Sequence, residues 1–155
     1  MKSSRRPKKG FTLIELLVAV VVIGILAAMG IPTYLKVTRN SRAAAVANDI
    51  NTLANASETY IMESGQWPPD TTTGTFPNEM AGYFAKRFFE SNTPMGGQWD
   101  FEQFDSGVTS AVGVVSPSLP EEEFVKVDSL IDDGNLATGQ FRKIADERYF
   151  WVIAE

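Results

Sequence analysis

The sequence predicts an α+β fold: a long N-terminal helix, membrane-spanning in its first half, packed on a small antiparallel sheet domain. Residues 11–31 are almost wholly apolar, and a helix of that length can cross a bilayer. Helical spacing of apolar residues continues beyond this segment, and four short stretches rich in β-branched and aromatic residues follow toward the C-terminus. With 155 residues, the chain has room for one modest domain after the apolar segment.

The composition excludes several classes of enzyme and metal site. The chain has no Cys and no His, so it has no disulfide framework, zinc ribbon, thiol nucleophile or Ser-His-Asp triad. No other nucleophile–base pair and no phosphate loop has a supporting motif, and we expect a non-enzymatic protein. Five of the 14 basic residues precede Gly10 and all 19 acidic residues follow it, so we expect the domain to bind no nucleic acid.

The basic cluster before Gly10 orients the apolar segment. Because Lys and Arg favour the cytoplasmic side of a membrane helix, we expect a single-pass protein with its N-terminus in the cytoplasm. A secretory signal peptide would need small residues at a cleavage site, and "ILAAMG" supplies a poor one. A plain signal anchor leaves Glu15, an acid inside the apolar run, unexplained. Cleavage after Gly10 would create a cation for it, the new α-amine of Phe11.

The N-terminal residues resemble the signature motif of a known family. "KKG" followed by "FTLIELL", then "IGILAA" and "IPTY", resembles the cleavage and methylation signature of type IV prepilins and type II secretion pseudopilins over residues 8–35. The resemblance implies that prepilin peptidase removes a basic leader, residues 1–10, by cutting between Gly10 and Phe11. Phe11 would then be N-methylated, and Glu15 would pair with the Phe11 amine of a neighbouring subunit during assembly.

The same resemblance implies the organisation and partners of the mature chain. Residues 11–33 would form the transmembrane and assembly helix, and residues 34–155 an amphipathic helix plus a globular pilin-like domain. The protein would sit in the inner membrane, with its C-terminal domain periplasmic, or extracellular in a filament. Its partners would be other pilin-like subunits and an inner-membrane assembly platform. Gly24, Gly30 and Pro32 weaken the helix, and the resemblance implies that it bends or unwinds there on assembly.

Beyond Pro32 the helical pattern becomes amphipathic and is predicted to reach residue 62. Its apolar stripe is predicted to lie on the globular domain and consists of Ala43, Val46, Ile50, Leu53, Ser57 and Tyr60. Gly65 is a suitable C-cap, and two prolines follow it. A short helix is expected within 77–91, and strands are expected at 99–104, 108–115, 141–144 and 149–153. Ser118 and Glu121 match a capping box that would begin another helix.

An acidic stretch before the third strand raises the question of calcium. Asp128, Asp132, Asp133 and Asn135 crowd around Gly134, and some major pseudopilins hold a loop with a C-terminal calcium site. However, "DDGN" lacks the alternation of a calcium loop and fits a plain turn. We therefore expect no metal and no cofactor, with calcium as the less favoured alternative.

Two classes of function remain open. The first is a structural subunit of a pilus-like filament. Within it we prefer a type II secretion pseudopilin. The pattern "Y..E.G.WPP" at residues 60–69 and the "TPMGGQW" turn resemble pseudopilins, and the chain lacks the C-terminal disulfide of many type IV pilins. The alternative within this class is a type IV pilin for adhesion, motility or DNA uptake. The second class is a membrane-anchored binding domain that never polymerises.

Overall fold

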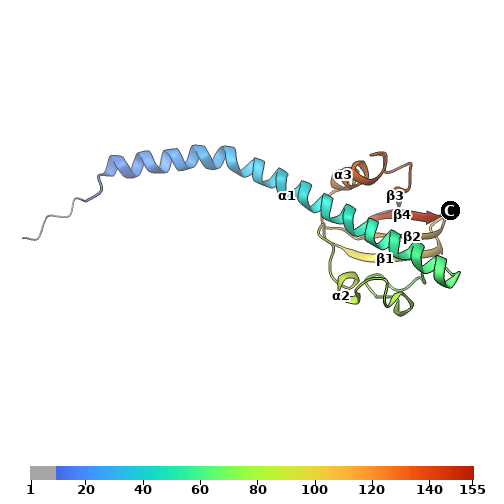
Figure 1. The fold of residues 1–155 in the computed structure, drawn as a ribbon. Coiled ribbons are helices and arrows are strands. Elements are labelled where there is room, and N and C mark those ends of the chain that lie inside the picture. The colour runs from blue at the N-terminus through green and yellow to red at the C-terminus, as the bar shows by residue number, and fades with distance from the viewer. Residues whose placement is uncertain (1–9) are drawn as a thin grey trace, which may run out of the picture. The chain divides into compact units, whose positions relative to one another are not determined.

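A computed structural model describes residues 10–155 of the chain. The first element is α1 (Leu13–Ser64), a helix of 52 residues that contains Pro32 and is drawn as one unbroken ribbon in Figure 1. The chain divides into two compact units, and the boundary between them lies within α1, between Thr38 and Arg39. The first half of α1 thus belongs to one unit and the second half to the other.

The first half of α1 is apolar and uncovered. Its large apolar side chains lie in the open, from Leu13, which is 88% exposed, to Val37, which is 61% exposed. By length and composition this segment can cross a membrane. A signal sequence near the N-terminus meets the same criteria. A helix that is apolar on every side needs lipid or other protein segments around it.

The second half of α1 carries the stripe that the sequence predicts. Ala43, Val46, Ile50, Leu53, Ser57 and Tyr60 are all buried. The helix ends two residues later than expected, at Ser64, and Gly65 follows with a φ of +70°. The Gly65 N–H donates to the carbonyl of Ile61 at 2.9 Å, so the predicted glycine cap is confirmed.

The expected short helix within 77–91 is wrong in extent. The structure has a single 3-10 turn, η1 (Asn78–Met80), and one separate helical turn, α2 (Lys86–Phe89). Gly82, with a φ of +105°, interrupts the segment between them. The apolar side chains still serve the core, because Met80 and Phe89 are fully buried.

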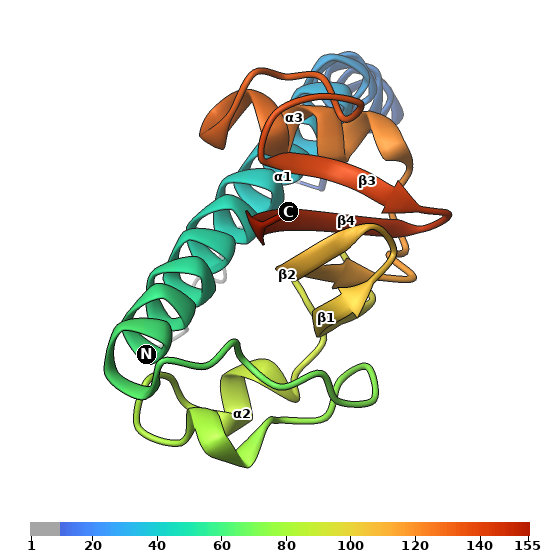
Figure 2. The ribbon, with the colours of Figure 1, turned by 90° about the vertical axis from the view of Figure 1, so that its right-hand side faces the viewer.

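Four antiparallel strands form the sheet. They are β1 (Gln98–Asp105), β2 (Val108–Val115), β3 (Phe141–Ala145) and β4 (Arg148–Ala154), arranged in the order β1-β2-β4-β3. All four predicted strands are confirmed, and β2 has the predicted bounds. Figure 2 shows the second half of α1 lying across one face of this sheet, so the predicted α+β fold class is confirmed.

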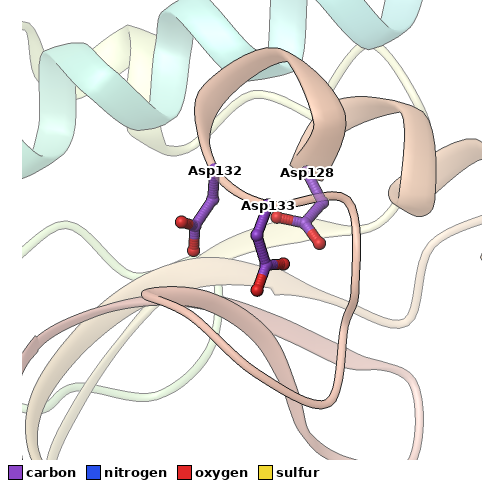
Figure 3. Close-up of side chains that lie close together, drawn as sticks. All are labelled: Asp128, Asp132 and Asp133. Atoms are coloured by element: carbon purple, nitrogen blue, oxygen red, sulfur yellow. The ribbon is translucent and has the colours of Figure 1, made fainter.

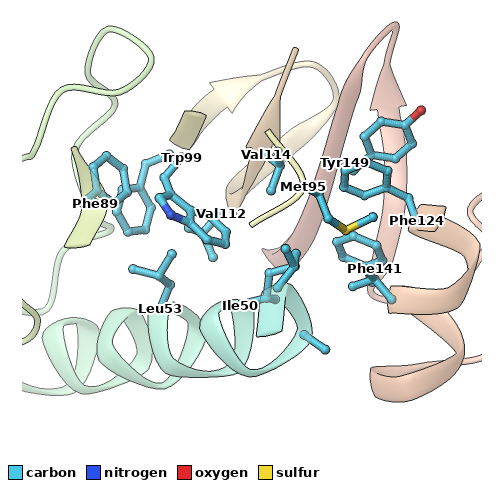
Figure 4. Close-up of a cluster of buried hydrophobic side chains, with 14 of the residues drawn as sticks. Ile50, Leu53, Phe89, Met95, Trp99, Val112, Val114, Phe124, Phe141 and Tyr149 are labelled. Carbon is cyan, nitrogen blue, oxygen red and sulfur yellow. The ribbon is translucent and has the colours of Figure 1, made fainter. Parts of the chain in front are cut away.

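The core lies between α1 and the sheet. Figure 4 shows Ile50 and Leu53 of α1 pointing toward the sheet, where Trp99, Val112 and Val114 face them. Rings close the core at its two ends. Phe89 stacks on Phe101 with ring centroids 5.3 Å apart, and Phe124 stacks on Tyr149 at 4.0 Å.

The opposite face of the sheet buries a charged cluster. Asp100 and Glu102 alternate along β1 with the core residues, and each is only 3% exposed. Arg148 of β4 forms ion pairs with both carboxylates, at 2.8 Å from Asp100. Its guanidinium also lies over the ring of Phe150, and that ring covers Gly113 of β2.

The last helix, α3 (Glu121–Ile131), begins without the predicted capping box. Pro120, not Ser118, holds the N-cap position, and no side chain caps the helix. Proline fits there because this residue precedes the helix in an extended conformation and its missing N–H would have had no partner within the helix. Phe124 and Val127, three residues apart on this helix, are fully buried and face the core.

Candidate functional site

The predicted processing site, Gly10–Phe11, lies just before α1. Both residues are exposed, and the Phe11 side chain is 82% exposed. A Cβ placed at Gly10 would meet no atom within 4 Å, so this glycine is not required by packing within the subunit. A peptidase could reach this bond without unfolding any element. The basic residues of the leader before Gly10 lie outside the described residues.

Glu15 is held by its own helix. Its carboxylate accepts hydrogen bonds from the backbone N–H and the hydroxyl of Thr12, both at 2.8 Å. The Glu15 N–H in turn donates to the Thr12 hydroxyl at 3.3 Å. This reciprocal arrangement is a capping box, and it satisfies two N–H groups at the start of α1. In the uncleaved chain the Phe11 nitrogen is an amide, so Thr12 is the partner that Glu15 has.

The three residues predicted to weaken the helix all lie in open surroundings. A Cβ at Gly24 or Gly30 would meet no atom within 4 Å, and α1 stays helical through Pro32. Pro32 has no N–H for the carbonyl of Ala28, and its neighbour Thr33 donates its hydroxyl to Met29 at 3.2 Å. These residues do not close on one another or on Glu15. Bending on assembly stays a prediction.

The acidic residues after α3 do come together. Asp128 lies in the last turn of α3, and Asp132 and Asp133 follow the helix. One carboxylate oxygen of each lies within 4.8 Å of the other two, and Figure 3 shows the three side chains gathered below the end of the helix. Asn135 takes another role, because its side-chain oxygen accepts the N–H of Ala137 at 3.2 Å.

The carboxyl groups of this cluster differ in their proton affinity. Burial raises the pKa of Asp128 to about 6, and the charges of Asp133 and Asp132 act in the same direction. The backbone N–H groups of Gly134 and Asn135 oppose this shift. The hydroxyl of Thr138, at 2.7 Å, holds the pKa of Asp133 below its usual value. The cluster therefore contains one carboxyl that resists ionisation beside one that favours it.

Sequence reasoning missed two features of these sites. The Thr12–Glu15 pair fits the S/T-x-x-E spacing of a capping box, so the letters "TLIE" contained the signal. The pairing of Arg148 with Asp100 and Glu102 had no comparable signal. It joins strands far apart in the sequence and depends on the register of the sheet.

Comparisons with known proteins find matches among fimbrial proteins and type IV pilins. Residues 5–31 match the family model described as the prokaryotic N-terminal methylation motif. A fimbrial protein of Pseudomonas aeruginosa is 39% identical over 71 residues, which are 43% of this chain and 46% of that protein. The type IV major pilin protein PilE1 of Neisseria gonorrhoeae is 30% identical over 82 residues, which are 51% of this chain and 50% of that protein.

Two further matches extend into the domain. The fimbrial protein EcpC of Eikenella corrodens is 28% identical and covers 70% of this chain and 71% of its own length. The solved structure of the major type IV pilin PilA1 from Clostridium difficile has a TM-score of 0.50 at 17% identity, covering 76% of this chain and 97% of that chain. This likeness shows the fold alone. The chain spans about half the length of the first curated relatives that it matches.

Proposed function

We propose that this chain, which carries an N-terminal methylation motif and has the pilin fold, is a non-enzymatic structural subunit of a type IV pilus. The main support is the segment 11–35, in which Glu15 is the only charged residue and the apolar side chains are uncovered. Such a surface requires either a bilayer or the packed helices of other subunits.

The relatives favour a pilus over a secretion pseudopilus. They are named as fimbrial proteins and type IV major pilins. Apart from the absence of a disulfide, the sequence features that led us to prefer a pseudopilin lie in 60–69 and 93–99. Beyond the last residues of α1 and the first residues of β1, these are loops, where sequence varies most readily among related proteins. Our preference for a pseudopilin is therefore replaced by the alternative, a type IV pilin.

In the proposed pathway the chain first enters the inner membrane, with residues 1–10 in the cytoplasm and the C-terminal domain on the other side. Prepilin peptidase cuts between Gly10 and Phe11, and Phe11 is N-methylated. The cut converts the Phe11 amide into an amine that is positive at neutral pH. Assembly then brings the Glu15 carboxylate of one subunit to the Phe11 amine of another, so that the two charges enter the filament interior as a pair.

The processing step is tested by intact-mass measurement of the mature protein from a host that contains a prepilin peptidase. The mature chain should begin at Phe11 and carry one methyl group. A bulky residue in place of Gly10 should leave uncleaved precursor in the membrane. A mature protein that starts at Met1, or after residue 30, would instead support the second candidate, a membrane-anchored domain that does not polymerise.

The assembly step is tested by charge variants of Glu15. Glu15→Ala and Glu15→Gln should be inserted and cleaved normally but should form few filaments, because the amine would enter the interior without a counter-charge. Glu15→Asp should give an intermediate number. The matched control is Glu58→Ala, which removes an exposed carboxylate farther along the same helix. Filaments are counted by electron microscopy at equal subunit levels, and wild-type numbers from Glu15→Ala would exclude the pairing.

A further inference from the structure

The hairpin between β1 and β2 ends in an exposed aromatic residue on an unusual backbone. Phe104 is 71% exposed, and its φ of +56° lies in the left-handed region, which bulky side chains rarely adopt. Ser106 and Gly107, with φ of +52° and +81°, form the turn that follows. Strained residues of this kind cluster at binding and switching sites, so Phe104 is a candidate anchor for a partner.

The tip of this hairpin, residues 104–107, also carries a negative charge that no cation meets. Asp105 is exposed, and among residues 10–155 it forms no ion pair. One of its carboxylate oxygens accepts the backbone N–H of Ser106 at 2.6 Å, which fixes the carboxylate beside the turn. The tip therefore offers an aromatic ring and a carboxylate from adjacent residues.

A groove between α1 and α3 has the complementary chemistry. It is lined by Asn40, Ala43, Ala44, Lys126, Ser129 and Leu130. Half of these residues are apolar, and Leu130 is 58% exposed, so an apolar surface faces the solvent here. The volume of the groove is about 250 Å³, below the roughly 300–1,000 Å³ of pockets that hold small molecules. A groove of this size suits a single large side chain.

Lys126 brings a positive charge to this groove. Its ammonium donates to both carboxylate oxygens of Glu123, at 3.0 and 2.9 Å, and the guanidinium of Arg39 lies 3.5 Å from the same carboxylate. Glu123 is buried, whereas the side chains of Lys126 and Arg39 remain exposed. Two cations thus share one carboxylate, and they keep a positive charge that a carboxylate from outside can meet.

The tip and the groove lie toward opposite edges of the sheet. β1 and β3 are its edge strands, the tip follows β1, and α3 contacts β3, as Figure 2 shows. Three strand spacings, about 14 Å, separate the two edges. The exposure of Phe104 shows that it does not fill the groove of its own chain. Complementary surfaces at different places on one molecule join copies head to tail, and such contacts build open filaments unless they close into a ring.

We propose that Phe104 of one subunit inserts into the α1–α3 groove of a second copy of this chain, with Asp105 beside Lys126 of that copy. The contact rests on the proposed pilus function and adds to the packing of the apolar helix segments. The ring covers Leu130 of the second copy, and the removal of both apolar surfaces from water drives the association. The charge pair sets the orientation of docking more than its strength.

Cross-linking of assembled filaments tests the contact directly, because the chain has no cysteine of its own. Ser106→Cys at the tip and Ser129→Cys in the groove are introduced together, and filaments from a host with a prepilin peptidase are treated with a short bismaleimide. A ladder of covalent oligomers is expected, since each subunit offers both sides of the contact. Filaments of either single variant should give monomers, and mixed filaments of the two single variants should give dimers only. The matched control combines Ser106→Cys with Ser91→Cys, at an exposed residue after α2.

Two substitutions weaken the contact, one from each side. Phe104→Gly should reduce filament counts roughly tenfold or more at equal subunit levels, because truncating a buried aromatic anchor weakens an interface by such a factor. In detergent micelles this variant should melt no lower than the wild type, because glycine adopts a φ of +56° readily. Leu130→Ala should also reduce the counts. Val125→Ala, on the same helix but outside the groove, is its control and should not.

Filaments that give no ladder, or an equally strong ladder from the control pair, would overturn the proposal. Wild-type filament counts from Phe104→Gly would do the same. In each of these cases filaments still form, so the pilus assignment would stand. A wild-type chain that is processed but forms no filaments would instead refute the pilus assignment, and this contact with it.

Discussion

Replacing Arg148 by Met would test whether one cation stabilises the outer face of the sheet. Asp100 and Glu102 are each 3% exposed, and Arg148 pairs with both. Burial raises the pKa of Asp100, and the hydrogen bond from Arg148 lowers it. Arg148→Met keeps a stem to cover Phe150 but leaves two buried carboxylates without a counter-charge. Breaking a buried ion pair in this way costs about 3–5 kcal/mol.

The expected loss is large enough to measure by thermal unfolding. At about 2–4 °C per kcal/mol for a chain of this size, the melting temperature at pH 7 should fall by roughly 6–20 °C. Circular dichroism of the full chain in detergent micelles follows the transition. The control is Arg142→Met, whose partner Glu155 is 77% exposed, and it should cost less than about 1 kcal/mol.

The pH dependence separates lost charge pairing from lost packing. Without Arg148, which lowers it, the pKa of Asp100 should rise further in the folded state. The folded variant then binds more protons than the unfolded chain, so its deficit should shrink as the pH falls from 7 toward 5. Adding Asp100→Asn and Glu102→Gln to Arg148→Met should recover most of the stability. A deficit below 1 kcal/mol, or one unaffected by pH and by these changes, would refute the reasoning.

Three further outcomes are expected. Gly113→Ala should destabilise the domain by about 1–3 kcal/mol or more in the same melts, since its Cβ would lie 2.1 Å from the Tyr149 carbonyl oxygen; an unchanged melt would contradict this close contact. The free energy of unfolding should rise as the pH falls from 7.5 to 5.5, because the pKa of Asp128 is about 6 in the folded protein and its carboxyl takes up a proton in this range. Asp128→Asn should remove this rise, and a variant with the pH profile of the wild type would contradict the role of Asp128. Thr12→Val should keep filament counts well above those of Glu15→Ala and leave the melt of the C-terminal domain unchanged, since it removes only a hydroxyl that competes with the Phe11 amine for Glu15 in the proposed pairing; counts as low as those of Glu15→Ala would contradict this.

The long-period features of this fold could be predicted from the sequence. The stripe along the second half of α1 repeats over several turns, and each of the four strands has a run of β-branched or aromatic residues bounded by turn residues. The glycine cap at Gly65 was predictable because a φ of +70° favours glycine. These signals depend on residues close together in the sequence, and the helical stripe repeats over more turns than chance would give.

What could not be predicted depends on single contacts or on the pairing of distant strands. The prediction of one short helix within 77–91 is wrong because two separate turns can bring the same four apolar residues to the core. Ser118 and Glu121 have the spacing of a capping box, but the N-cap residue of α3 is Pro120. The burial of Asp128 depends on the chain after α3 folding back over it, which "DDGN" alone does not reveal.

The capping box at the start of α1 has a consequence for the energetics of filament growth. Before cleavage, Glu15 already has two donors from Thr12, so its charge is not bare. In the proposed pairing, joining a filament exchanges the Thr12 donors for the Phe11 amine of a neighbour, so the net gain is smaller than the full strength of the new ion pair. In the proposed filament, a subunit that left could return its Glu15 carboxylate to the Thr12 donors, so it would not carry a bare charge back into the membrane.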